Sequence, residues 1–490
     1  MNVGHATDAP LHAVPDRVAL VVGGEALTYR QLEQRIRQVE VALAAAGVGP
    51  GDRVALVNLG SALSVATIFG AARLGAATAQ MNAYLTPGEL GQLAELVGTK
   101  IGVAGDRYAA ALGSVLDGPV LVEEQVFGAA VDGGTAPSGV GGGEDTALVL
   151  FTSGTTGLPK PIPISHEVIA DRLAFYSKPI DPEVDQVVDM MSAPIFHIAG
   201  TLGLFVSLHQ GKKMVLLPKF DPAEWLTLVE QHRVAQTFVV PAMLRRILDH
   251  PRFESTDLSS LRSLSYGAAA APVDLVRRAV AAFPGVDFSN TFGQTETLGA
   301  YAALTPEDHR RGDRFDSVGR PLAGVEVKIV HPGTEQELES GGVGEFLVRA
   351  DQNTTTEWLH TGDSGRQDQE GYLYLVGRLS DTINRGGEKF GPIEVEEVLR
   401  SHPSVVDAGV VGVPDAELGE RVGAAVVVSA PVPTEELLRH CASGLATYKV
   451  PEYLEFTDEL PVTVLGKPDR KALRAWLGGA PRVGRTTSGP

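Results

Sequence analysis

The sequence predicts an α/β protein that is built from several compact units. Its 490 residues are 44% hydrophobic, which is a globular composition, and this length suggests two to four units that can bury a sizeable core. Short apolar stretches alternate with helical stretches, as expected of an α/β fold with a parallel sheet. The first of these apolar stretches are residues 54–58, 101–104 and 120–122.

The chain opens with a hairpin-like piece and a capped helix. Residues 18–22 are apolar and are followed by Gly23 and Gly24, which suits a strand and a turn. Thr28 and Gln31 have the spacing of a capping box, which predicts a helix over residues 29–46 that ends at Gly47.

Residues 54–83 form the longest region of low polarity. Asn58, Arg73 and Gln80 interrupt it, so it predicts a strand followed by a buried helix rather than a membrane span. Residues 132–146 are rich in Gly, Ser and Pro. They predict a mobile surface loop rather than a domain linker, because the strand after them resumes the same pattern.

The residues after the apolar run 147–151 predict a phosphate-binding loop. Two glycines allow a tight turn in which several backbone N–H groups converge on one anion, and hydroxyls with one lysine complete the cradle. These residues are Thr152, Ser153, Gly154, Thr155, Thr156, Gly157 and Lys160. The spacing is not that of the P-loop of GTPases and ordinary ATPases. An ordinary loop rich in Ser, Thr and Gly has a similar composition, so this alternative stays open.

Charge and cysteine content exclude several classes of partner. The net charge of −19 and the pI near 5.1 argue against nucleic acid or an anionic membrane, so any phosphate site must be local. Cys441 is the only cysteine, which rules out an internal disulfide and predicts a small buried residue. Residues 1–15 show no export signal, and we expect a cytoplasmic protein.

The helix-then-strand rhythm continues with a helix over residues 225–232 and strands near 239–240, 261–267 and 286–292. In open α/β sheets, ligands bind where the strands end. The turns at the strand ends are therefore expected to form the walls of one pocket with the 152–160 loop. These turns are residues 194–200, 266–272 and 290–297.

Motifs in a fixed order then reveal a family. They are Pro194-Ile195-Phe196-His197, residues 267–272, residues 291–296, His360-Thr361-Gly362-Asp363, Gly377-Arg378, residues 384–389 and Leu465-Gly466-Lys467. The chain resembles, over nearly its whole length, the adenylate-forming superfamily of acyl-CoA synthetases, stand-alone adenylation domains and beetle luciferases. In pattern it is most similar to bacterial acyl-CoA synthetases.

The resemblance implies a large N-terminal adenylation domain of stacked α/β subdomains over residues 1–377. It further implies a hinge at 378–381 and a small, mobile α+β lid domain over 382–477. In the lid we predict helices starting near 391 and over 435–444, and strands at 405–413 and 422–428. Residues 478–490 carry few apolar groups and are expected to be disordered.

The implied activity is that of an AMP-forming acyl-CoA synthetase with ATP, Mg²⁺ and coenzyme A. The acid is first joined to AMP as an activated mixed anhydride, and the thiol of CoA then displaces AMP. An anionic α-phosphate must accept an anionic carboxylate, so the chemistry requires a clamp of Mg²⁺ and lysine.

The resemblance assigns a role to each motif residue. Glu296 would hold Mg²⁺, Thr295 would contact the α-phosphate, and residues 152–160 would hold the β- and γ-phosphates. Lys467 would bridge the acyl carboxylate and the α-phosphate, and Asp363 and Arg378 would bind the ribose. Phe292 would stack on adenine, and Gly267, Ala268 and Ala269 would close the opposite side. Gly386, Gly387 and Lys389 would line the CoA tunnel. Without the shared order, Asp363 could equally be a turn residue and Glu296 a carboxylate at a helix N-terminus.

His197 taken alone would be a core histidine, but the resemblance places it at the wall of the acyl pocket and near the pantetheine tunnel. Amino-acid-activating relatives carry an aspartate in this segment, to pair with the substrate ammonium. This chain has no carboxylate beside Phe196, His197 and Ile198, so an amino acid would lack a counter-ion. The apolar surroundings fit a fatty or aromatic acid.

The chain departs from the family pattern at four places. Ser380 replaces the usual pivot residue of the hinge, Pro161 follows the phosphate loop, and Phe292 replaces a commoner tyrosine. The stretch between Arg349 and Trp358 is several residues shorter than usual. These departures leave room for a ligase that acts mainly on a preformed acyl-adenylate, or for an enzyme that loads a carrier protein. A non-catalytic nucleotide-binding relative is the alternative of another class, and the protein could be a monomer or a homodimer.

Overall fold

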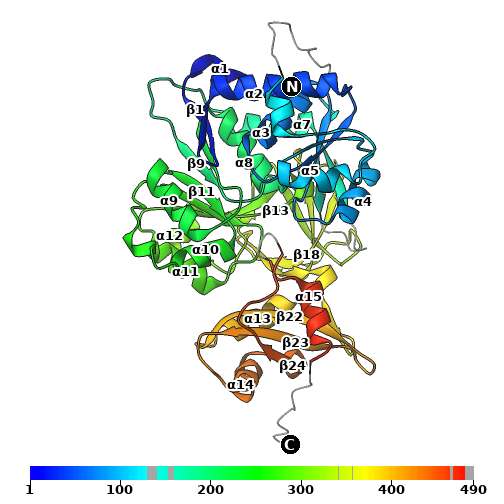
Figure 1. The fold of residues 1–490 in the computed structure, drawn as a ribbon. Coiled ribbons are helices and arrows are strands. Elements are labelled where there is room, and N and C mark those ends of the chain that lie inside the picture. Colours follow the sequence, from blue (N-terminus) through cyan, green and yellow to red (C-terminus); the bar gives the residue numbers. More distant parts are fainter. Residues whose placement is uncertain (130–140, 153–158, 340, 356, 464–466, 481–490) are drawn as a thin grey trace, which may run out of the picture. The chain divides into compact units, whose positions relative to one another are not determined.

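The computed structural model describes residues 1–129, 141–152, 159–339, 341–355, 357–463 and 467–480. The chain divides into two compact units (Figure 1). Unit 1 comprises Met1–Ala268, Arg278–Arg310 and Ala350–Glu357, and unit 2 comprises Ala269–Arg277, Arg311–Arg349 and Trp358–Pro490. The predicted α/β class is confirmed, whereas the predicted hinge and domain boundaries stay predictions.

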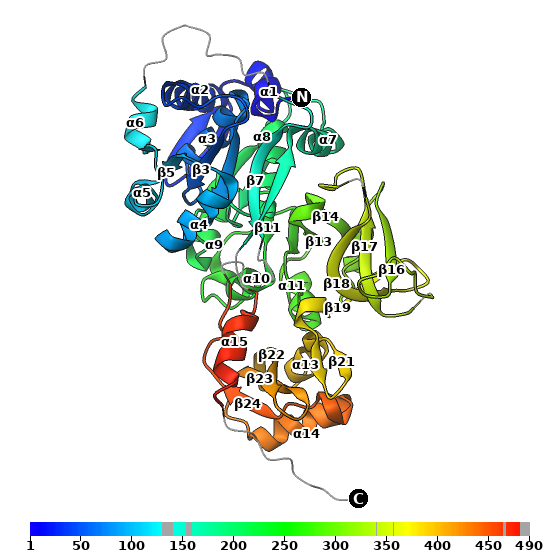
Figure 2. The ribbon, with the colours of Figure 1, turned by 90° about the vertical axis from the view of Figure 1, so that its right-hand side faces the viewer.

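The first sheet of unit 1 has the order β6-β5-β3-β4-β7-β8. Its strands are β3 (Arg53–Val57), β4 (Ala77–Met81), β5 (Ile101–Ala104), β6 (Val120–Leu121), β7 (Thr146–Thr152) and β8 (Lys160–Ser165). The helices that follow its strands are α3 (Ala62–Arg73), α4 (Pro87–Val97), α5 (Asp106–Gly113), α6 (Glu123–Phe127) and α7 (His166–Tyr176). Helices α3 and α5 contact β3, and Figure 2 shows them beside this sheet.

The second sheet of unit 1 runs β14-β13-β12-β11-β9-β10-β1-β2. Its strands are β1 (Val18–Val22), β2 (Glu25–Thr28), β9 (Val188–Met191), β10 (Lys213–Leu216), β11 (Gln236–Val239), β12 (Ser263–Gly267), β13 (Asp287–Gln294) and β14 (Gly299–Leu304). The other helices of this part of the chain are α1 (Asp8–Ala13), α2 (Tyr29–Ala45), α8 (Ile198–His209), α9 (Pro222–His232), α10 (Pro241–Leu248), α11 (Val273–Ala282) and α12 (Pro306–Arg311).

Both sheets are mixed rather than wholly parallel. Strands β2, β8 and β14 run antiparallel to β1, β7 and β13, their immediate predecessors in the chain. A short connection can join only antiparallel neighbours, because a parallel pair needs a crossover of a dozen or more residues. The helical crossovers between the other strands give the parallel pairs that the alternation predicted.

The predicted start of the chain is confirmed in detail. Thr28 caps α2, and the reciprocal bonds between Thr28 and Gln31 form the predicted capping box. The apolar region around α3 is the predicted strand and buried helix, since every residue of α3 is buried. Among the described helices, none combines the length and the apolar character that a membrane span requires.

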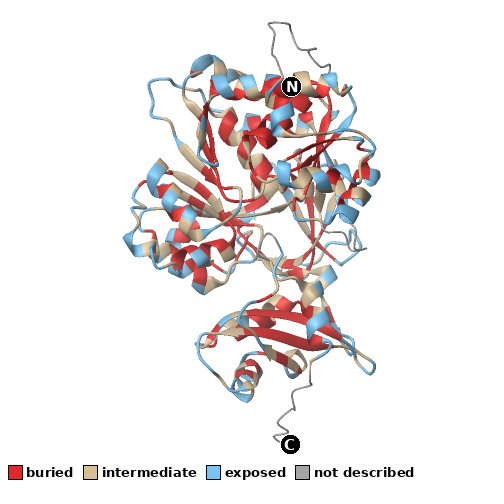
Figure 3. Ribbon diagram, in the orientation of Figure 1, coloured by how far each residue is buried: buried red, intermediate tan, exposed pale blue. Residues whose placement is uncertain are grey.

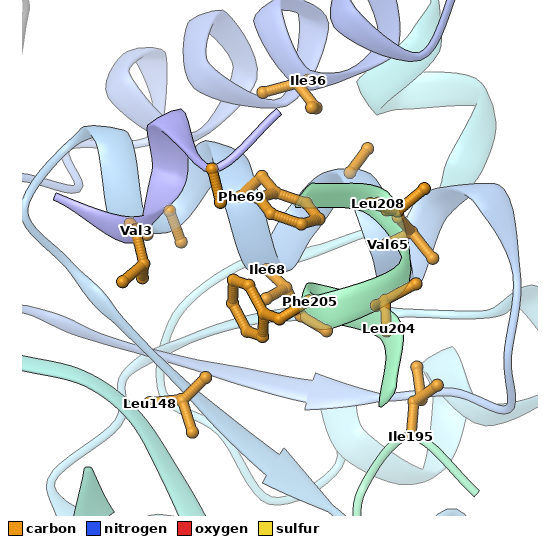
Figure 4. Packing of buried hydrophobic residues seen from close by; sticks show 14 of the residues in the cluster. Val3, Ile36, Val65, Ile68, Phe69, Leu148, Ile195, Leu204, Phe205 and Leu208 are labelled. Atoms are coloured by element: carbon orange, nitrogen blue, oxygen red, sulfur yellow. The ribbon is translucent and has the colours of Figure 1, made fainter. Parts of the chain in front are cut away.

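The large core of unit 1 lies between α2, α3 and α8. Figure 4 shows Phe69 of α3 close to Phe205 and Leu208 of α8, with Ile36 of α2 above them. The rings of Phe69 and Phe205 meet edge to face, with their centroids 5.0 Å apart. This packing fixes α8, the helix that follows His197.

Unit 2 contains two sheets. The first is antiparallel and consists of β16 (Glu326–Val330), β17 (Gly344–Arg349), β18 (Leu359–Gln367) and β19 (Leu373–Arg378). The second contains β20 (Ile383–Arg385), β21 (Glu388–Phe390), β22 (Val405–Asp415), β23 (Gly419–Val428) and β24 (Tyr453–Phe456). The helices after β21 are α13 (Pro392–Arg400), α14 (Thr434–Gly444) and α15 (Arg470–Leu477), and the short strand β15 (Arg320–Pro321) precedes β16.

The C-terminal part of unit 2 has its own core. Strands β22 and β23 are buried along most of their length (Figure 3). Cys441 packs in this core as predicted, and burial raises the pKa of its thiol to about 12, so it is not a reactive thiolate. Most of the predicted loop 132–146 and of the tail 478–490 lies outside the described residues.

Candidate active site

The two ends of the predicted phosphate loop are adjacent. Thr152 ends β7 and Lys160 begins β8, and these two residues are paired across the antiparallel strands. Lys160 is exposed. Ser153, Gly154, Thr155, Thr156 and Gly157 lie outside the described residues, so their predicted cradle stays a prediction.

At Gly267 two neighbouring strands approach so closely that no side chain fits between them. It ends β12 beside Thr291 of β13, and a Cβ atom on Gly267 would lie 2.2 Å from the Thr291 carbonyl oxygen. The next residue, Ala268, has a φ of 63°, which is costly for any residue other than glycine. Such backbone strain concentrates at functional sites, where it is stabilised by the surrounding structure.

The loop after β13 carries Thr295 and Glu296 in a 3₁₀ turn (Thr295–Thr297). Leu298 and Gly299 follow with φ values of 45° and 96°, so the chain reverses sharply into β14. This reversal is tight, since a Cβ atom on Gly293 would lie 1.8 Å from the Gly299 carbonyl oxygen. The ring of Phe292 meets that of Tyr301 edge to face, 5.1 Å between centroids, so one face of Phe292 is already oriented by the sheet.

His197 stands at the N-cap of α8, directly after the turn that follows β9. Its carbonyl accepts the N–H of Thr201 at 3.0 Å, and its ring lies 4.8 Å from that of Phe196. Ile195 and Leu298 belong to one hydrophobic cluster, and a Cβ atom on Gly299 would lie 3.1 Å from the Leu202 side chain. The structure thus brings the His197 segment and the Glu296 loop together, as the sequence predicted.

The nearest upstream acid, Asp189 on β9, is already paired. Its carboxylate lies 3.2 Å from Nζ of Lys212, and it is largely buried. Burial raises its pKa, although Lys212 opposes this shift. Asp189 therefore serves a structural ion pair. Residues 192–209 themselves contain no Asp or Glu.

Asp363 and Arg378 meet across β18 and β19. Their backbones are paired in register, and Arg378 Nε lies 2.7 Å from Asp363 Oδ1. Thr361 joins them, because its hydroxyl accepts the Asp363 N–H at 3.1 Å and its carbonyl accepts from Arg378 Nη1 at 3.2 Å. Asp363 is almost fully buried, whereas Arg378 is partly exposed.

Lys467 shares unit 2 with this pair. Its N–H donates to the hydroxyl of Thr463, and its carbonyl accepts the N–H of Thr463. Removal from water lowers the pKa of Lys467, the charge of Arg378 lowers it further, and Asp363 and Asp381 act in the opposite direction. The fields of Asp363 and Arg378 therefore reach Lys467, which the family resemblance assigned to the same nucleotide.

The predicted CoA loop is the hairpin of β20 and β21. Gly386 and Gly387 form its turn with φ values of 61° and 95°, which favour glycine, and Lys389 is exposed. Arg385 is anchored to Glu452 at 2.6 Å, and Glu452 also pairs with Arg421. Two exposed glycines and a lysine therefore project from a rigidly held strand.

Comparison with known proteins decides the family. The model for AMP-binding enzymes matches residues 8–356, and the model for the C-terminal domain of AMP-binding enzymes matches residues 394–467. The chain belongs to the AMP-binding enzyme family.

Individual members of this family are similar over almost the full length. A feruloyl-CoA synthase from Amycolatopsis sp is 35% identical over 92% of this chain and 94% of its own length. A fatty acid–[acyl-carrier-protein] ligase, ScoC of Streptomyces coeruleorubidus, is 31% identical over 94% of this chain and 93% of its own length. Among solved structures, the amide bond synthetase McbA from Marinactinospora thermotolerans is 29% identical, covers 97% of this chain and 99% of its own, and has a TM-score of 0.86.

Membership in the family confirms the predicted adenylate-forming superfamily, and the relatives confirm the predicted class of AMP-forming acid–thiol ligase. ATP and CoA as co-substrates fit this class. The roles of the individual site residues, the use of Mg²⁺ and the oligomeric state stay predictions.

The donor set around Glu296 fits a Mg²⁺ ion that is shared with phosphates. Among the described residues no group of three His, Cys, Asp or Glu side chains could hold a metal by itself. Mg²⁺ at nucleotide sites is typically bound by one or two carboxylates and by the phosphates of the substrate. Glu296 is half-buried, and within the described ranges its carboxylate makes no hydrogen bond or ion pair, which suits such a ligand.

The sequence prediction missed a group of residues that holds this same loop. Thr354 donates its N–H and its hydroxyl to the carbonyl of Glu296, and Gln352 and Arg172 both donate to the carbonyl of Ala300. Sequence spacing offers no signal for these contacts, because Arg172 and Gln352 are 180 positions apart.

Proposed function

We propose that this AMP-binding enzyme is an acid–CoA ligase that activates a fatty or aromatic carboxylic acid as its acyl-adenylate with Mg·ATP and then transfers the acyl group to CoA. The observation that carries this proposal is the group formed by Asp363, Arg378 and Lys467 in unit 2. It combines a buried carboxylate for ribose hydroxyls with a lysine whose charge is tuned by its neighbours.

The nucleotide would be bound by the motif residues that the family resemblance assigns to it. Asp363 and Arg378 would bind the ribose hydroxyls, and Phe292 would stack on adenine, with Gly267, Ala268 and Ala269 closing the other side.

Charge neutralisation would come from Glu296, Thr295 and the 152–160 loop. When bound, Mg²⁺ supplies positive charge to the phosphates at the point where a second anion must approach. The carboxylate of Glu296 would hold the ion, Thr295 would contact the α-phosphate, and Thr152 and Lys160 would take part in holding the β- and γ-phosphates.

Lys467 would place its ammonium between the acyl carboxylate and the α-phosphate. A lysine suits this role, because its charge is compact and its stem is long. The lowered pKa follows from poor hydration, and a poorly hydrated cation interacts more strongly with two anions than one exposed to water.

The acid class follows from the His197 segment. No acidic side chain stands in residues 192–209, and Asp189 is engaged by Lys212, so a substrate ammonium would be buried without a counter-ion. The imidazole of His197 instead lies beside the ring of Phe196, and such an apolar neighbour suits an acyl chain or an aromatic ring.

The second step would require the predicted hinge at residues 378–381. We propose that the lid, residues 382–477, rotates about this hinge so that Gly386, Gly387 and Lys389 line the tunnel for CoA. Ser380 is exposed, and its neighbour Asp381 lies 3.8 Å from Arg470 of α15.

A cytoplasmic location accords with the single buried cysteine.

The acceptor has two alternatives, each suggested by a relative. ScoC is named as a ligase for an acyl carrier protein, and McbA is named as an amide bond synthetase. A carrier-protein thiol or an amine could therefore replace CoA in the second step, while the chemistry of the first step would be unchanged.

The experiment is a screen of acids for pyrophosphate release from Mg·ATP, followed by product analysis with CoA, a carrier protein or an amine. The panel holds fatty acids of graded length, cinnamic and benzoic acids, and amino acids as the matched charged control. We expect release with a fatty or aromatic acid and an acyl-CoA product. Release with an amino acid alone would contradict the acid class, and no adenylate with any acid would contradict the function.

A further inference from the structure

The short segment between β17 and β18 contacts the loop that carries Glu296. Gln352 lies at its centre, half-buried, and donates from Nε2 to the carbonyl of Ala300 at 3.0 Å. Its Oε1 accepts a hydrogen bond from Nη1 of Arg172, and Nη2 of Arg172 donates to the same Ala300 carbonyl at 3.2 Å. One carbonyl at the end of the loop is therefore held by two side chains from distant parts of unit 1.

The start of the loop is held in the same manner. The N–H of Thr354 donates to the carbonyl of Glu296 at 2.9 Å, and its hydroxyl donates to this carbonyl at 3.1 Å. The carbonyls of residues 296 and 300 thus each accept two hydrogen bonds from outside the loop. Between them lie Leu298 and Gly299, whose positive φ values make the backbone dependent on such support.

Arg172 is an unusual residue for this position. It projects from α7, is 3% exposed, and forms no ion pair with a carboxylate in the described parts of the chain. Burial lowers its pKa. An arginine that is buried without a carboxylate is costly, so its contacts with neutral groups here point to a role in holding them.

We infer that Gln352, together with Arg172 and Thr354, positions the 296–300 loop for the adenylation step. These residues touch no substrate. They act through the backbone of residues 296–300. This backbone carries the carboxylate of Glu296 and also Leu298, which belongs to one hydrophobic cluster with Ile195. The inference rests on the proposed function, since it assigns Glu296 to Mg²⁺.

The test compares two half-reactions in Gln352→Ala and Thr354→Val. The first is acid-dependent exchange of pyrophosphate into ATP over a range of Mg²⁺ concentrations, and the second is formation of acyl-CoA from supplied acyl-AMP. We expect exchange to fall about 10- to 100-fold, since small misplacements of catalytic groups cost this much, and half-saturating Mg²⁺ to rise. Acyl-CoA formation from supplied adenylate should stay within about twofold of wild type.

Two further variants separate positioning from folding. Thr355→Val makes the same substitution one residue further on, where the hydroxyl accepts the N–H of Glu357, and it should behave as wild type. Thr354→Ser keeps the hydroxyl donor that Thr354→Val loses, and it should keep the wild-type Mg²⁺ dependence. A merely structural role would lower both half-reactions and the Tm together, without moving half-saturating Mg²⁺.

Unchanged exchange and unchanged Mg²⁺ dependence in both Gln352→Ala and Thr354→Val would overturn the inference, as would equal losses in the two half-reactions. These outcomes are distinct from failure of the proposed function. If wild type itself makes no acyl-AMP with any acid, the function fails and the inference fails with it. If wild type makes acyl-AMP and the variants make it at the same rate and with the same Mg²⁺ dependence, only the inference fails.

Discussion

Asp363 and Arg378 face one another on paired strands, and Nε of the arginine lies 2.7 Å from Oδ1 of the aspartate. The Thr361 carbonyl accepts from Arg378 Nη1, so the arginine that holds the carboxylate is itself anchored before any ligand arrives. A carboxylate that is fixed in this way accepts hydrogen bonds from the paired hydroxyls of a ribose without a further loss of side-chain entropy.

Asp363→Asn should therefore weaken ATP binding. The amide keeps the shape of the carboxylate but loses its charge and one acceptor, so we expect half-saturating ATP to rise by about tenfold or more. The measurement is the ATP dependence of acid-dependent pyrophosphate exchange. An unchanged ATP dependence, with the fold intact, would remove Asp363 from the nucleotide site.

Glu296→Ala should lose adenylate formation by orders of magnitude, because water does not replace a carboxylate that fixes Mg²⁺ on developing phosphate charge. The measurement is pyrophosphate release at increasing Mg²⁺, with Asp313→Ala as a control, since Asp313 pairs with Arg311 at the surface. Near wild-type release in Glu296→Ala would contradict the metal assignment.

Gly267→Ala should destabilise unit 1 as well as impair the site. The added Cβ would lie 2.2 Å from the carbonyl oxygen of Thr291, so the two strands must separate, and overpacking of this kind costs about 1–3 kcal/mol. We expect a lower Tm in thermal unfolding followed by circular dichroism. Gly88→Ala in α4 is the matched control, since nothing lies within 4 Å of its added Cβ and alanine favours a helix. Equal Tm values in the two variants would contradict the close approach at Gly267.

Ser380→Pro should impair thioester formation more than adenylation. Proline stiffens the proposed hinge, and only the second step should require the lid to rotate. The measurement compares acyl-CoA formation from supplied acyl-AMP with pyrophosphate exchange in the same preparation. Equal losses in both steps, with an unchanged Tm, would argue against a hinge at residues 378–381.

Much of the local structure could be predicted from the sequence, because its causes are local. The capping box of α2 and the strand β5 follow from residues within a few positions of each other, and they occur as predicted. The nearness of the His197 segment to the Glu296 loop was also predictable, because parallel strands place their following turns at one edge of the sheet.

The contacts that hold the site could not be predicted in the same way. Arg172, Gln352 and Ala300 meet only after three distant segments have folded, and nothing in their own neighbourhoods signals the meeting. The pairing of Asp363 with Arg378 depends on the register of β18 and β19, which only the folded backbone determines. Non-local hydrogen bonds of this kind have no periodicity that a sequence pattern could reveal.

The adenylation step should have an alkaline limit set by Lys467. The pKa of this lysine is lowered from its ordinary value of 10.5, and only the protonated form carries the charge that the step needs. The exchange rate should therefore fall as the pH rises through the lowered pKa, at a lower pH than for an ordinary lysine. Lys467→Arg stays protonated throughout, so its exchange, although slower, should lack this alkaline limb.

The most direct test of the two-step ligase is acid-dependent ATP–pyrophosphate exchange in wild type and in Lys467→Ala, measured beside acyl-CoA formation from supplied acyl-AMP. We predict that wild type performs both reactions. Lys467→Ala should lose the exchange and still convert the supplied adenylate with CoA, because its charge serves only the first transition state. Persistent exchange in Lys467→Ala, or a wild type that consumes acyl-AMP but ignores ATP and free acid, would contradict the account.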